Sequence, residues 1–263
     1  MEVKTKLRAE KLSCGYGKKV VLSEICFEVL AGEFFCILGP NGVGKSTLFK
    51  TILGFLPRKG GKFLVDDRDI LDFKREQLAR VIAYVPQAHI PPFPFSVQDV
   101  VLMGRTACFE NSRSPKQVDR DRVEEILESM GIAPLKSRVY TEISGGERQM
   151  VLIARALAQE PKFLVMDEPA SNLDYGNQMR VLEQIMKLKS SGIGIIMASH
   201  YPDHAFLCSS NVILIEGNGE IRSGYCDDIL TEETLSGAYG IPVRILEEAD
   251  EDGVLKSCAM KFQ

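Results

Sequence analysis

One segment constrains the fold of this 263-residue chain more than any other: Gly39-Pro40-Asn41-Gly42-Val43-Gly44-Lys45-Ser46. It matches the pattern G-x-x-x-x-G-K-[ST] at every required position. The apolar run Glu33–Gly39 before it is typical of a strand, and Ser46–Leu56 after it is typical of a helix that Pro57 ends. A loop in this context turns successive backbone N–H groups toward phosphate oxygens, and the helix N-terminus adds the positive end of its dipole. The sequence therefore predicts a phosphate-binding loop, and the alternative is a glycine-rich turn that ends in Lys-Ser by coincidence.

The residues of this loop have separate expected roles. Lys45 supplies a mobile cation for the β- and γ-phosphates, and the hydroxyl of Ser46 is a ligand for Mg²⁺. Thr47 is placed to bond the α-phosphate. The complete set of expected phosphate-loop residues is Gly39, Pro40, Asn41, Gly42, Gly44, Lys45, Ser46 and Thr47.

Composition excludes several classes of protein. The chain carries 32 Lys and Arg against 36 Asp and Glu, and its net charge of −4 argues against binding nucleic acid by bulk charge. No apolar run approaches the roughly 20 residues that cross a bilayer, and the first eight residues lack the apolar core of a secretory signal. The seven cysteines are scattered without C-x-x-C spacing, so we expect no disulfide framework, no zinc site and a reducing cytosol. A function at a membrane would require the membrane part of a partner.

Strand-like and helical segments alternate along the chain, which predicts an α/β fold with a parallel sheet. Further strands are expected over Lys62–Val65, Val81–Val85, Phe163–Met166 and Ile193–Ala198. The pattern between residues 91 and 160 is helical, with helices expected over Val97–Gly104, Asp119–Met130 and Ser144–Gln159. We therefore expect a helical lobe inserted between strands of one sheet.

The last fifty residues carry a hairpin signal and a charged stretch. Val212–Ile215 and Glu220–Ile221 flank Gly217-Asn218-Gly219, a turn sequence typical of two antiparallel strands. The acidic stretch Glu247–Asp252 is expected to be a solvated tail.

Two adjacent carboxylates, Asp167 and Glu168, follow the apolar run Phe163–Met166. Mg²⁺ prefers hard oxygen ligands and keeps waters, so Asp167 is well placed to hold a metal-bound water. Glu168 can take the proton from an attacking water. The alternative is that Glu168 merely caps a loop.

A third element lies between the other two: Ile143-Ser144-Gly145-Gly146-Glu147-Arg148-Gln149, a turn that opens a helix and offers N–H donors to an anion. With these motifs in this order, the chain resembles the ATP-binding cassette (ABC) ATPases from Leu7 to about Tyr225. The resemblance implies one ABC ATPase domain over residues 1–263, which binds and hydrolyses ATP with Mg²⁺. It implies an α/β P-loop NTPase (RecA-like) core with an N-terminal antiparallel β region and an inserted helical subdomain. The core would take residues 1–90 and 161–225, the subdomain 91–160, and a C-terminal extension 226–263.

The resemblance also implies roles for single residues. Tyr16 would stack on adenine, although a loop tyrosine beside two glycines is the alternative. Gln87 would contact Mg²⁺ and the attacking water, and His200 would contact the γ-phosphate, although a lone histidine after a strand is usually structural. Asp174, in Ser171-Asn172-Leu173-Asp174, would lie in a loop that communicates across a dimer; the alternative is an Asn/Asp turn that caps a helix. No motif includes the other two histidines, His89 and His204, which are expected to be structural.

In such ATPases two copies pair head-to-tail around two ATP molecules. The turn Ser144-Gly145-Gly146 of one copy would cover the γ-phosphate that Lys45 of the other copy holds. ATP binding would then close the dimer and hydrolysis would release it. This sequence departs from the commonest signature by having Ile143 for leucine and Glu147 for glutamine, and it keeps the serine and the glycines.

Three kinds of ABC protein remain open: an ATPase subunit of a separate membrane permease, a soluble ABC ATPase of DNA repair or translation, and an exporter. The second kind typically brings a coiled coil, a zinc hook or a second cassette, and an exporter half needs a fused membrane domain; we expect none of these here. One segment is similar to the matching segment in ATPases of iron–siderophore, haem and cobalamin importers: Phe95-Ser96-Val97-Gln98-Asp99-Val100-Val101-Leu102-Met103-Gly104-Arg105. Related metal-ion importers look alike, and an exporter with a separate permease stays an alternative.

Phe and Pro residues precede that segment, in Pro91-Pro92-Phe93-Pro94-Phe95. They are expected to form a docking surface for a permease helix, and the alternative is a hydrophobic staple with ordinary core packing. The expected partners are a second copy of the chain, integral membrane permease subunits and, indirectly, a substrate-binding protein, with no nucleic acid. The expected location is the cytoplasmic face of the cell membrane, as a peripheral protein.

Overall fold

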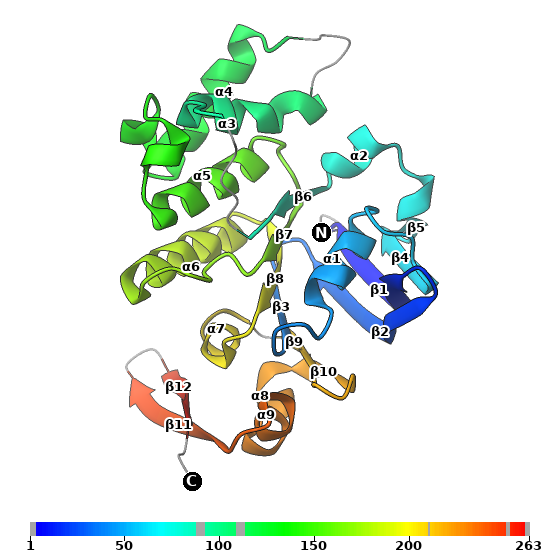
Figure 1. The fold of residues 1–263 in the computed structure, drawn as a ribbon. Coiled ribbons are helices and arrows are strands. Elements are labelled where there is room, and N and C mark those ends of the chain that lie inside the picture. Colours follow the sequence, from blue (N-terminus) through cyan, green and yellow to red (C-terminus); the bar gives the residue numbers. More distant parts are fainter. Residues whose placement is uncertain (1–3, 88–92, 109–113, 210, 251–252, 261–263) are drawn as a thin grey trace. The chain divides into compact units, whose positions relative to one another are not determined.

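The computed structural model describes residues 4–87, 93–108, 114–209, 211–250 and 253–260 (Figure 1). The chain divides into two compact units, Met1–Asp72 with Gly194–Gln263, and Phe73–Ile193. The predicted limits of the helical subdomain, residues 91 and 160, both fall within the second unit and stay a prediction. Five residues of the sequence predictions lie outside the described ranges: His89, Pro91, Pro92, Glu251 and Asp252.

An antiparallel sheet opens the first unit. Its strand order is β2-β1-β4-β5, and its strands are β1 (Lys6–Tyr16), β2 (Lys19–Leu30), β4 (Gly60–Val65) and β5 (Arg68–Asp69). A short 3₁₀ turn over Ile70–Asp72 follows. Along β1, buried side chains such as Leu7 and Ala9 alternate with more exposed ones, because successive residues of a strand point to opposite faces. The predicted N-terminal antiparallel β region is thereby confirmed.

A second set of strands in the same unit carries the phosphate loop. The order is β10-β9-β3-β8, with β3 (Phe34–Leu38), β8 (Gly194–Ser199), β9 (Asn211–Ile215) and β10 (Ile221–Tyr225). β3 runs parallel to β8 and β9, and every residue of β3 and β8 is buried, as expected for strands covered on both faces. β9 and β10 pair antiparallel, which confirms the predicted hairpin.

The helix after the phosphate loop is shorter than the sequence predicts. α1 covers Lys45–Ile52, so its predicted extension to Leu56 is wrong. The chain turns at Gly54, whose φ is 73°, and the N–H groups of Phe55 and Leu56 donate to the carbonyl of Lys50 at 2.8 and 2.9 Å. A glycine in the left-handed conformation ends a helix in this way because it has no Cβ to clash.

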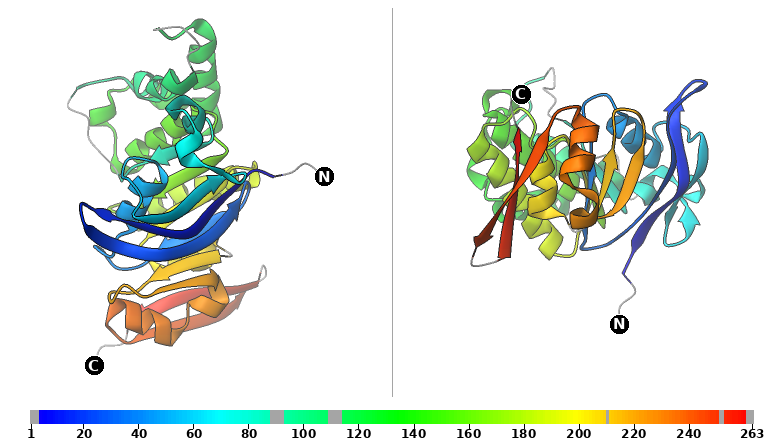
Figure 2. Two further views of the ribbon diagram at one scale, coloured as in Figure 1. Left: turned by 90° about the vertical axis from the view of Figure 1, so that its right-hand side faces the viewer. Right: turned by 90° about the horizontal axis from the view of Figure 1, so that it is seen from below.

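The C-terminal part of the first unit is folded, so the acidic stretch is not a tail, although Glu247 and Glu248 are exposed to solvent as predicted. Its elements are α7 (Pro202–Cys208), α8 (Cys226–Ile229), α9 (Glu232–Tyr239), β11 (Val243–Asp250) and β12 (Gly253–Met260). β11 and β12 form a hairpin (Figure 2, orange to red), in which Glu247 lies opposite Lys256, 3.3 Å from its ammonium group. The acidic composition concealed a strand whose order comes from its pairing with β12.

Both edges of this hairpin are anchored at one register position. Ile245 and Cys258 face each other across the two strands. The N–H of Ile245 donates to a carboxylate oxygen of Glu232 at 3.1 Å, and the N–H of Cys258 donates to Asp203 at 2.7 Å. The hairpin is therefore held by α9 on one side and by α7 on the other.

The second unit consists mainly of helices and contains two parallel strands. Its helices and strands are α2 (Arg75–Ala79), β6 (Ile82–Val85), α3 (Val97–Leu102), α4 (Gln117–Ser129), α5 (Gly145–Leu157), β7 (Phe163–Asp167) and α6 (Tyr175–Ser190). Short 3₁₀ turns cover Met103–Cys108, Ala133–Leu135 and Tyr140–Glu142. β6 pairs with β7 in parallel, so the helices from α3 to α5 are an insertion between neighbouring strands. In the described ranges, every helix is too short or too polar to span a membrane.

Candidate functional site

The phosphate loop places a buried cation beside its own backbone. Lys45 is 5% exposed, and its ammonium group donates to the carbonyls of Gly39 at 2.7 Å and Pro40 at 3.0 Å. Asn41, Gly42 and Ser46 are exposed along the same loop. The loop therefore closes on the ammonium group while its outer residues face solvent, an arrangement that suits an anion bound from outside.

The N-terminus of α1 differs in its capping from those of α5, α6 and α9. Ser144, Asp174 and Thr231 cap α5, α6 and α9 by accepting hydrogen bonds through their side chains. The N-cap of α1 is Gly44, which offers no side-chain acceptor, and the first turn of α1 contains no acidic residue. The first N–H groups of a helix have no partner within the helix, and the dipole there is positive. Together with Lys45, this N-terminus fits a phosphate group.

Tyr16 lies close to the same helix. The hydroxyl of Thr47 donates to the hydroxyl oxygen of Tyr16 at 3.4 Å, and the tyrosine side chain is 47% exposed. Both residues belong to the first unit. The expected adenine-stacking residue and the expected α-phosphate ligand are therefore neighbours in this structure.

His200 follows β8 in the first unit and is fixed from two sides. The Tyr201 ring lies 4.1 Å from the His200 ring, and the hydroxyl of Tyr239 donates to the His200 carbonyl at 3.0 Å. His204, by contrast, is buried with its Nδ1 3.0 Å from the Ser199 hydroxyl. Burial and the charge of His200 lower the pKa of His204 to about 4, so this second histidine is neutral at pH 7 and serves the packing of α7.

The two adjacent carboxylates end β7 in the second unit. Asp167 is 8% exposed, and the hydroxyl of Tyr84 donates to its carboxylate at 3.4 Å. Burial raises the pKa of Tyr84, and the charge and hydrogen bond of Asp167 raise it further, so the phenol stays a donor. In the described ranges no three or more His, Cys, Asp or Glu residues are arranged to hold a metal. The carboxylate of Asp167 is the kind of oxygen ligand that Mg²⁺ prefers, and Mg²⁺ takes few protein ligands and keeps several waters.

Glu168 adopts an uncommon backbone conformation. Its φ is 50°, in the left-handed region, which costs a residue with a side chain on the order of 1 kcal/mol or more. The hydroxyl and the N–H of Ser171 both donate to the Glu168 carbonyl, at 2.8 and 3.0 Å. The amide of Gln87 in turn donates to the Ser171 hydroxyl at 3.1 Å. The structure thus brings Gln87 and Glu168 together through Ser171, and such strained conformations cluster at active sites.

The Ser-Gly-Gly turn begins α5 with a reciprocal cap. The N–H of Glu147 donates to the Ser144 hydroxyl at 3.3 Å, and the N–H of Ser144 donates to the Glu147 carboxylate at 2.7 Å. The hydrogen bonds from Ser144 lower the pKa of Glu147. Two of the expected anion donors are therefore engaged within the chain, and Glu147 has a capping function that explains an acidic residue there.

Asp174 caps α6, which is the structural role that the sequence left open. Its carboxylate accepts from the backbone and side-chain N–H groups of Asn177 at 2.9 and 2.6 Å, and these bonds lower its pKa. A Cβ on Gly146 would lie 2.8 Å from the Asn177 side chain, so the starts of α5 and α6 are in contact. The Ser-Gly-Gly turn and the loop before α6 thus form one surface of the second unit.

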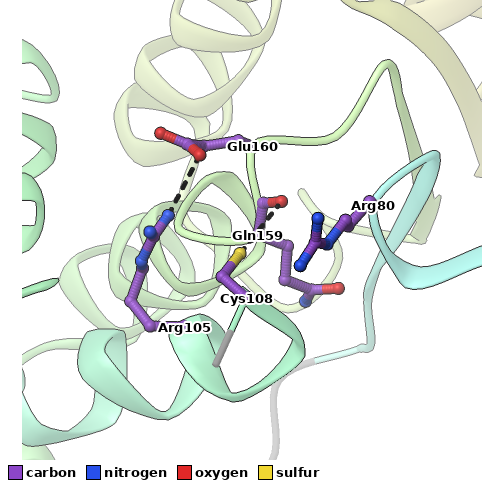
Figure 3. A pocket seen from close by; sticks show the side chains of 5 residues that line it. All are labelled: Arg80, Arg105, Cys108, Gln159 and Glu160. Carbon is purple, nitrogen blue, oxygen red and sulfur yellow. Dashed lines mark hydrogen bonds and ion pairs between the residues drawn. The ribbon is translucent and has the colours of Figure 1, made fainter. Parts of the chain in front are cut away.

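A cavity of about 240 Å³ in the second unit is lined by two arginines (Figure 3). Arg105 binds Asp119 at 3.1 Å and Glu160 at 3.2 Å, and it donates to the carbonyl of Ala158 at 2.9 Å. Arg105 thereby ties the turn after α3 to the start of α4 and the end of α5. Close packing also requires a glycine at the neighbouring position 104, because a Cβ there would lie 2.0 Å from the Arg155 carbonyl oxygen. Gly104 and Arg105 are thus explained by packing within the helical lobe.

Three residues near these sites were not predicted: Tyr84, Ser171 and Tyr239. Tyr84 precedes Gln87 by three residues, and Ser171 follows Glu168 by three, so proximity in sequence could have indicated both. Tyr239 lies 39 residues from His200, and no pattern in the sequence links the two.

Comparison with known proteins identifies the relatives of this chain. The profile of the ABC transporter family matches residues 22–171. An uncharacterized ABC transporter ATP-binding protein of Haemophilus influenzae is 41% identical over 95% of each chain. The hemin import ATP-binding protein HmuV of Ruegeria is 34% identical over 91% of this chain and 92% of its own. A solved inward-facing transporter of the metal-chelate ABC type has a TM-score of 0.87 and 29% identity, and covers 98% of each chain.

Proposed function

Because the chain belongs to the ABC transporter family and is an ATPase coupled to transport, we propose that it energises import of an iron chelate, haem, cobalamin or related metal substrate. Two findings support the cargo class. A hemin import protein is 34% identical along nearly the whole chain, and the solved transporter with the same fold is of the metal-chelate type. The proposed partners are separate permease subunits, a substrate-binding protein and a second copy of this chain, at the cytoplasmic face of the membrane.

Deleting the gene in its own organism tests the cargo. Uptake of ⁵⁵Fe-siderophore, ⁵⁵Fe-haem and ⁵⁷Co-cobalamin would be measured in the deletion strain and in strains complemented with the wild type or a Glu168→Gln variant. We expect one of the three uptakes to fail and to return only with the wild type. Normal uptake of all three would overturn these three cargoes and leave the ATPase activity standing, and an efflux defect would favour the exporter alternative.

In the proposed mechanism, Lys45 and the N-terminus of α1 bind the β- and γ-phosphates and Tyr16 stacks on adenine. Ser46, Asp167 and Gln87 would hold Mg²⁺, which when bound neutralises charge on the phosphates. Each of these side chains supplies the hydroxyl, carboxylate or amide oxygen that such a hard cation prefers. The chain contributes mainly position and charge.

Glu168 takes the proton of the attacking water in this proposal, and His200 contacts the γ-phosphate. The observation that supports Glu168 is its braced left-handed backbone, joined to Gln87 through Ser171. Glu168→Gln should abolish steady-state hydrolysis of ATP and retain ATP binding, because it removes the base and keeps the shape. Glu183→Gln, on the exposed face of α6, is the matched control and should hydrolyse normally. Near-normal turnover in the Glu168 variant would reject its assignment as the base.

The second copy would contribute Ser144, Gly145, Gly146 and the loop of Asp174. We expect the Glu168→Gln variant, loaded with ATP, to elute as a dimer in size-exclusion chromatography. An ATP-loaded variant that stays monomeric at every concentration would contradict the paired arrangement.

The proposed docking surface for the permease centres on two phenylalanines. Phe93 is 61% exposed and Phe95 is 36% exposed, with their ring centroids 6.0 Å apart. Exposed rings of this kind favour contact with another protein over core packing. Asp substitutions at both should abolish transport and copurification of the permease while intrinsic hydrolysis survives. Val118→Asp, at a 65% exposed position of α4, is the control; unchanged assembly in the double variant would favour the packing alternative.

A further inference from the structure

We propose that Tyr239, in the C-terminal extension, is a positioning residue for His200. This inference rests on the proposed contact of His200 with the γ-phosphate. Tyr239 is the last residue of α9 and is half-buried, and its hydroxyl donates to the His200 carbonyl oxygen at 3.0 Å. The tyrosine does not touch the reacting atoms in this role. It fixes the backbone from which the imidazole projects.

The loop that carries His200 is also held by short-range hydrogen bonds, such as the one from the N–H of Tyr201 to the Ser199 hydroxyl at 3.0 Å. It runs from the end of β8 at Ser199 to the start of α7 at Pro202. The centroid of the Tyr201 ring lies 4.1 Å from that of the His200 ring, but Tyr201 is itself 41% exposed and belongs to the same loop. A bond from a different element, such as the one from α9, limits the backbone torsions that set the imidazole direction.

The C-terminal extension also holds the first turn of α7, which directly follows this loop. Asp203 follows His200 by three residues, and its carboxylate accepts the N–H of Cys258 in β12 at 2.7 Å. The far end of α9 is also anchored, because Glu232 accepts from the N–H of Ile245 and from the guanidinium of Arg244, at 3.1 and 2.6 Å. The extension therefore holds both the loop and the helix after it, and Tyr239 supplies the bond to His200 itself.

Displacement of a positioned group by about 1 Å can cost roughly a hundredfold in rate, so loss of one restraint should cost less, about tenfold. Tyr239→Phe removes the hydroxyl and keeps the ring that packs in the unit. We expect kcat for ATP hydrolysis to fall about tenfold while the Kd for ATP stays within about twofold, because the phosphate loop is untouched. Tyr225→Phe, at a 66% exposed tyrosine of the same unit, is the matched control and should behave as the wild type.

A double-mutant cycle with His200→Ala separates positioning from general destabilisation. The rates would be measured by single-turnover hydrolysis of [γ-³²P]ATP, which records slow reactions over hours. If Tyr239 acts through His200, Tyr239→Phe lowers the rate in the wild type and has no further effect in the His200→Ala background. Equal losses in both backgrounds, or no loss in the wild type, would overturn the proposal. If His200→Ala itself hydrolyses normally, the proposed role of His200 fails instead, and the two failures are thereby distinct.

Histidine NMR gives a readout that does not depend on activity. The chain has three histidines, so ¹⁵N-labelled imidazole signals are few, and His200→Ala assigns the one of interest. Tyr239→Phe should shift or broaden the His200 signal and leave the His204 signal in place, whereas Tyr225→Phe should move neither. An unchanged His200 signal in the Tyr239 variant would contradict the positioning role.

Discussion

Replacing Arg105 by alanine should destabilise the helical lobe by about 3 kcal/mol. The side chains of Arg105 and its partner Asp119 are only 11% and 8% exposed, and removing one member of a buried pair typically costs about 3–5 kcal/mol. We expect the lower end of that range because Asp119 keeps the hydrogen bond from the N–H of Lys116 at 2.9 Å. The contact with Glu160, which is 49% exposed, adds little.

Arg122→Ala is the matched control for this prediction. Arg122 lies in the same unit and also binds Glu160, at 2.9 Å, but its side chain is 44% exposed, so its loss should cost less than about 1 kcal/mol. In a chain of this size, 1 kcal/mol shifts Tm by about 2–4 °C, which predicts a loss of about 6–12 °C for Arg105→Ala. Thermal unfolding followed by circular dichroism measures both variants. Equal shifts for the two arginines would refute the reasoning from burial.

The pH dependence gives this prediction a second check. Burial of Asp119 opposes its ionisation, but the hydrogen bond from Lys116 and the guanidinium of Arg105 outweigh burial, so its pKa is lowered. A carboxylate with a lowered pKa in the folded state stabilises above its unfolded pKa of about 3.9, and that stability is lost as the pH falls through the folded value. The Tm difference between the wild type and Arg105→Ala should therefore persist near neutral pH and narrow in strong acid.

Two further predictions concern the phosphate loop and the lobe. Lys45→Ala should weaken ATP binding about 10- to 100-fold, because it removes a charged hydrogen bond to the phosphates. Isothermal titration calorimetry measures the Kd, and Lys50→Ala, on the exposed face of α1, is the control. Equal affinities of the two variants for ATP would contradict the loop assignment. Gly104→Ala should cost about 1–3 kcal/mol of stability by overpacking, because its Cβ would meet the Arg155 carbonyl; an unchanged Tm would show that the turn after α3 shifts freely.

The sequence predicted the parts of the fold that rest on local patterns. The strand, loop and helix around Lys45, the buried strand before Asp167 and the hairpin at residues 211–225 each carry their own signal in period and turn residues. Errors arose where a single glycine or a charge pattern decided the outcome. α1 ends early because Gly54 turns left-handed, and the acidic run at Glu247 is part of a strand because it pairs with β12 in a hairpin.

The candidate site was predictable to the extent that its residues lie in contiguous motifs. The functional roles of Lys45, Asp167 and Glu168 could be predicted from the motifs around them. The hydrogen bonds that hold the two carboxylate residues in place could not. The hydroxyl of Tyr84 near Asp167 and the link from Gln87 to Ser171 depend on which strands lie side by side, and β6 and β7 are almost 80 residues apart in the chain. Tertiary contacts of this kind leave no periodic trace in one sequence.

The carboxylates of Glu232 and Asp203 at the C-terminal hairpin have a consequence for solubility. A two-stranded ribbon has two open edges, and each open edge is a template on which a strand from another molecule can add. At the register of Ile245 and Cys258, the outward N–H on both edges is already bonded to an acidic side chain. A strand from another molecule would have to displace a carboxylate acceptor at either edge before it could pair with the hairpin. The two carboxylates that hold the hairpin to α9 and α7 therefore also oppose edge-to-edge aggregation.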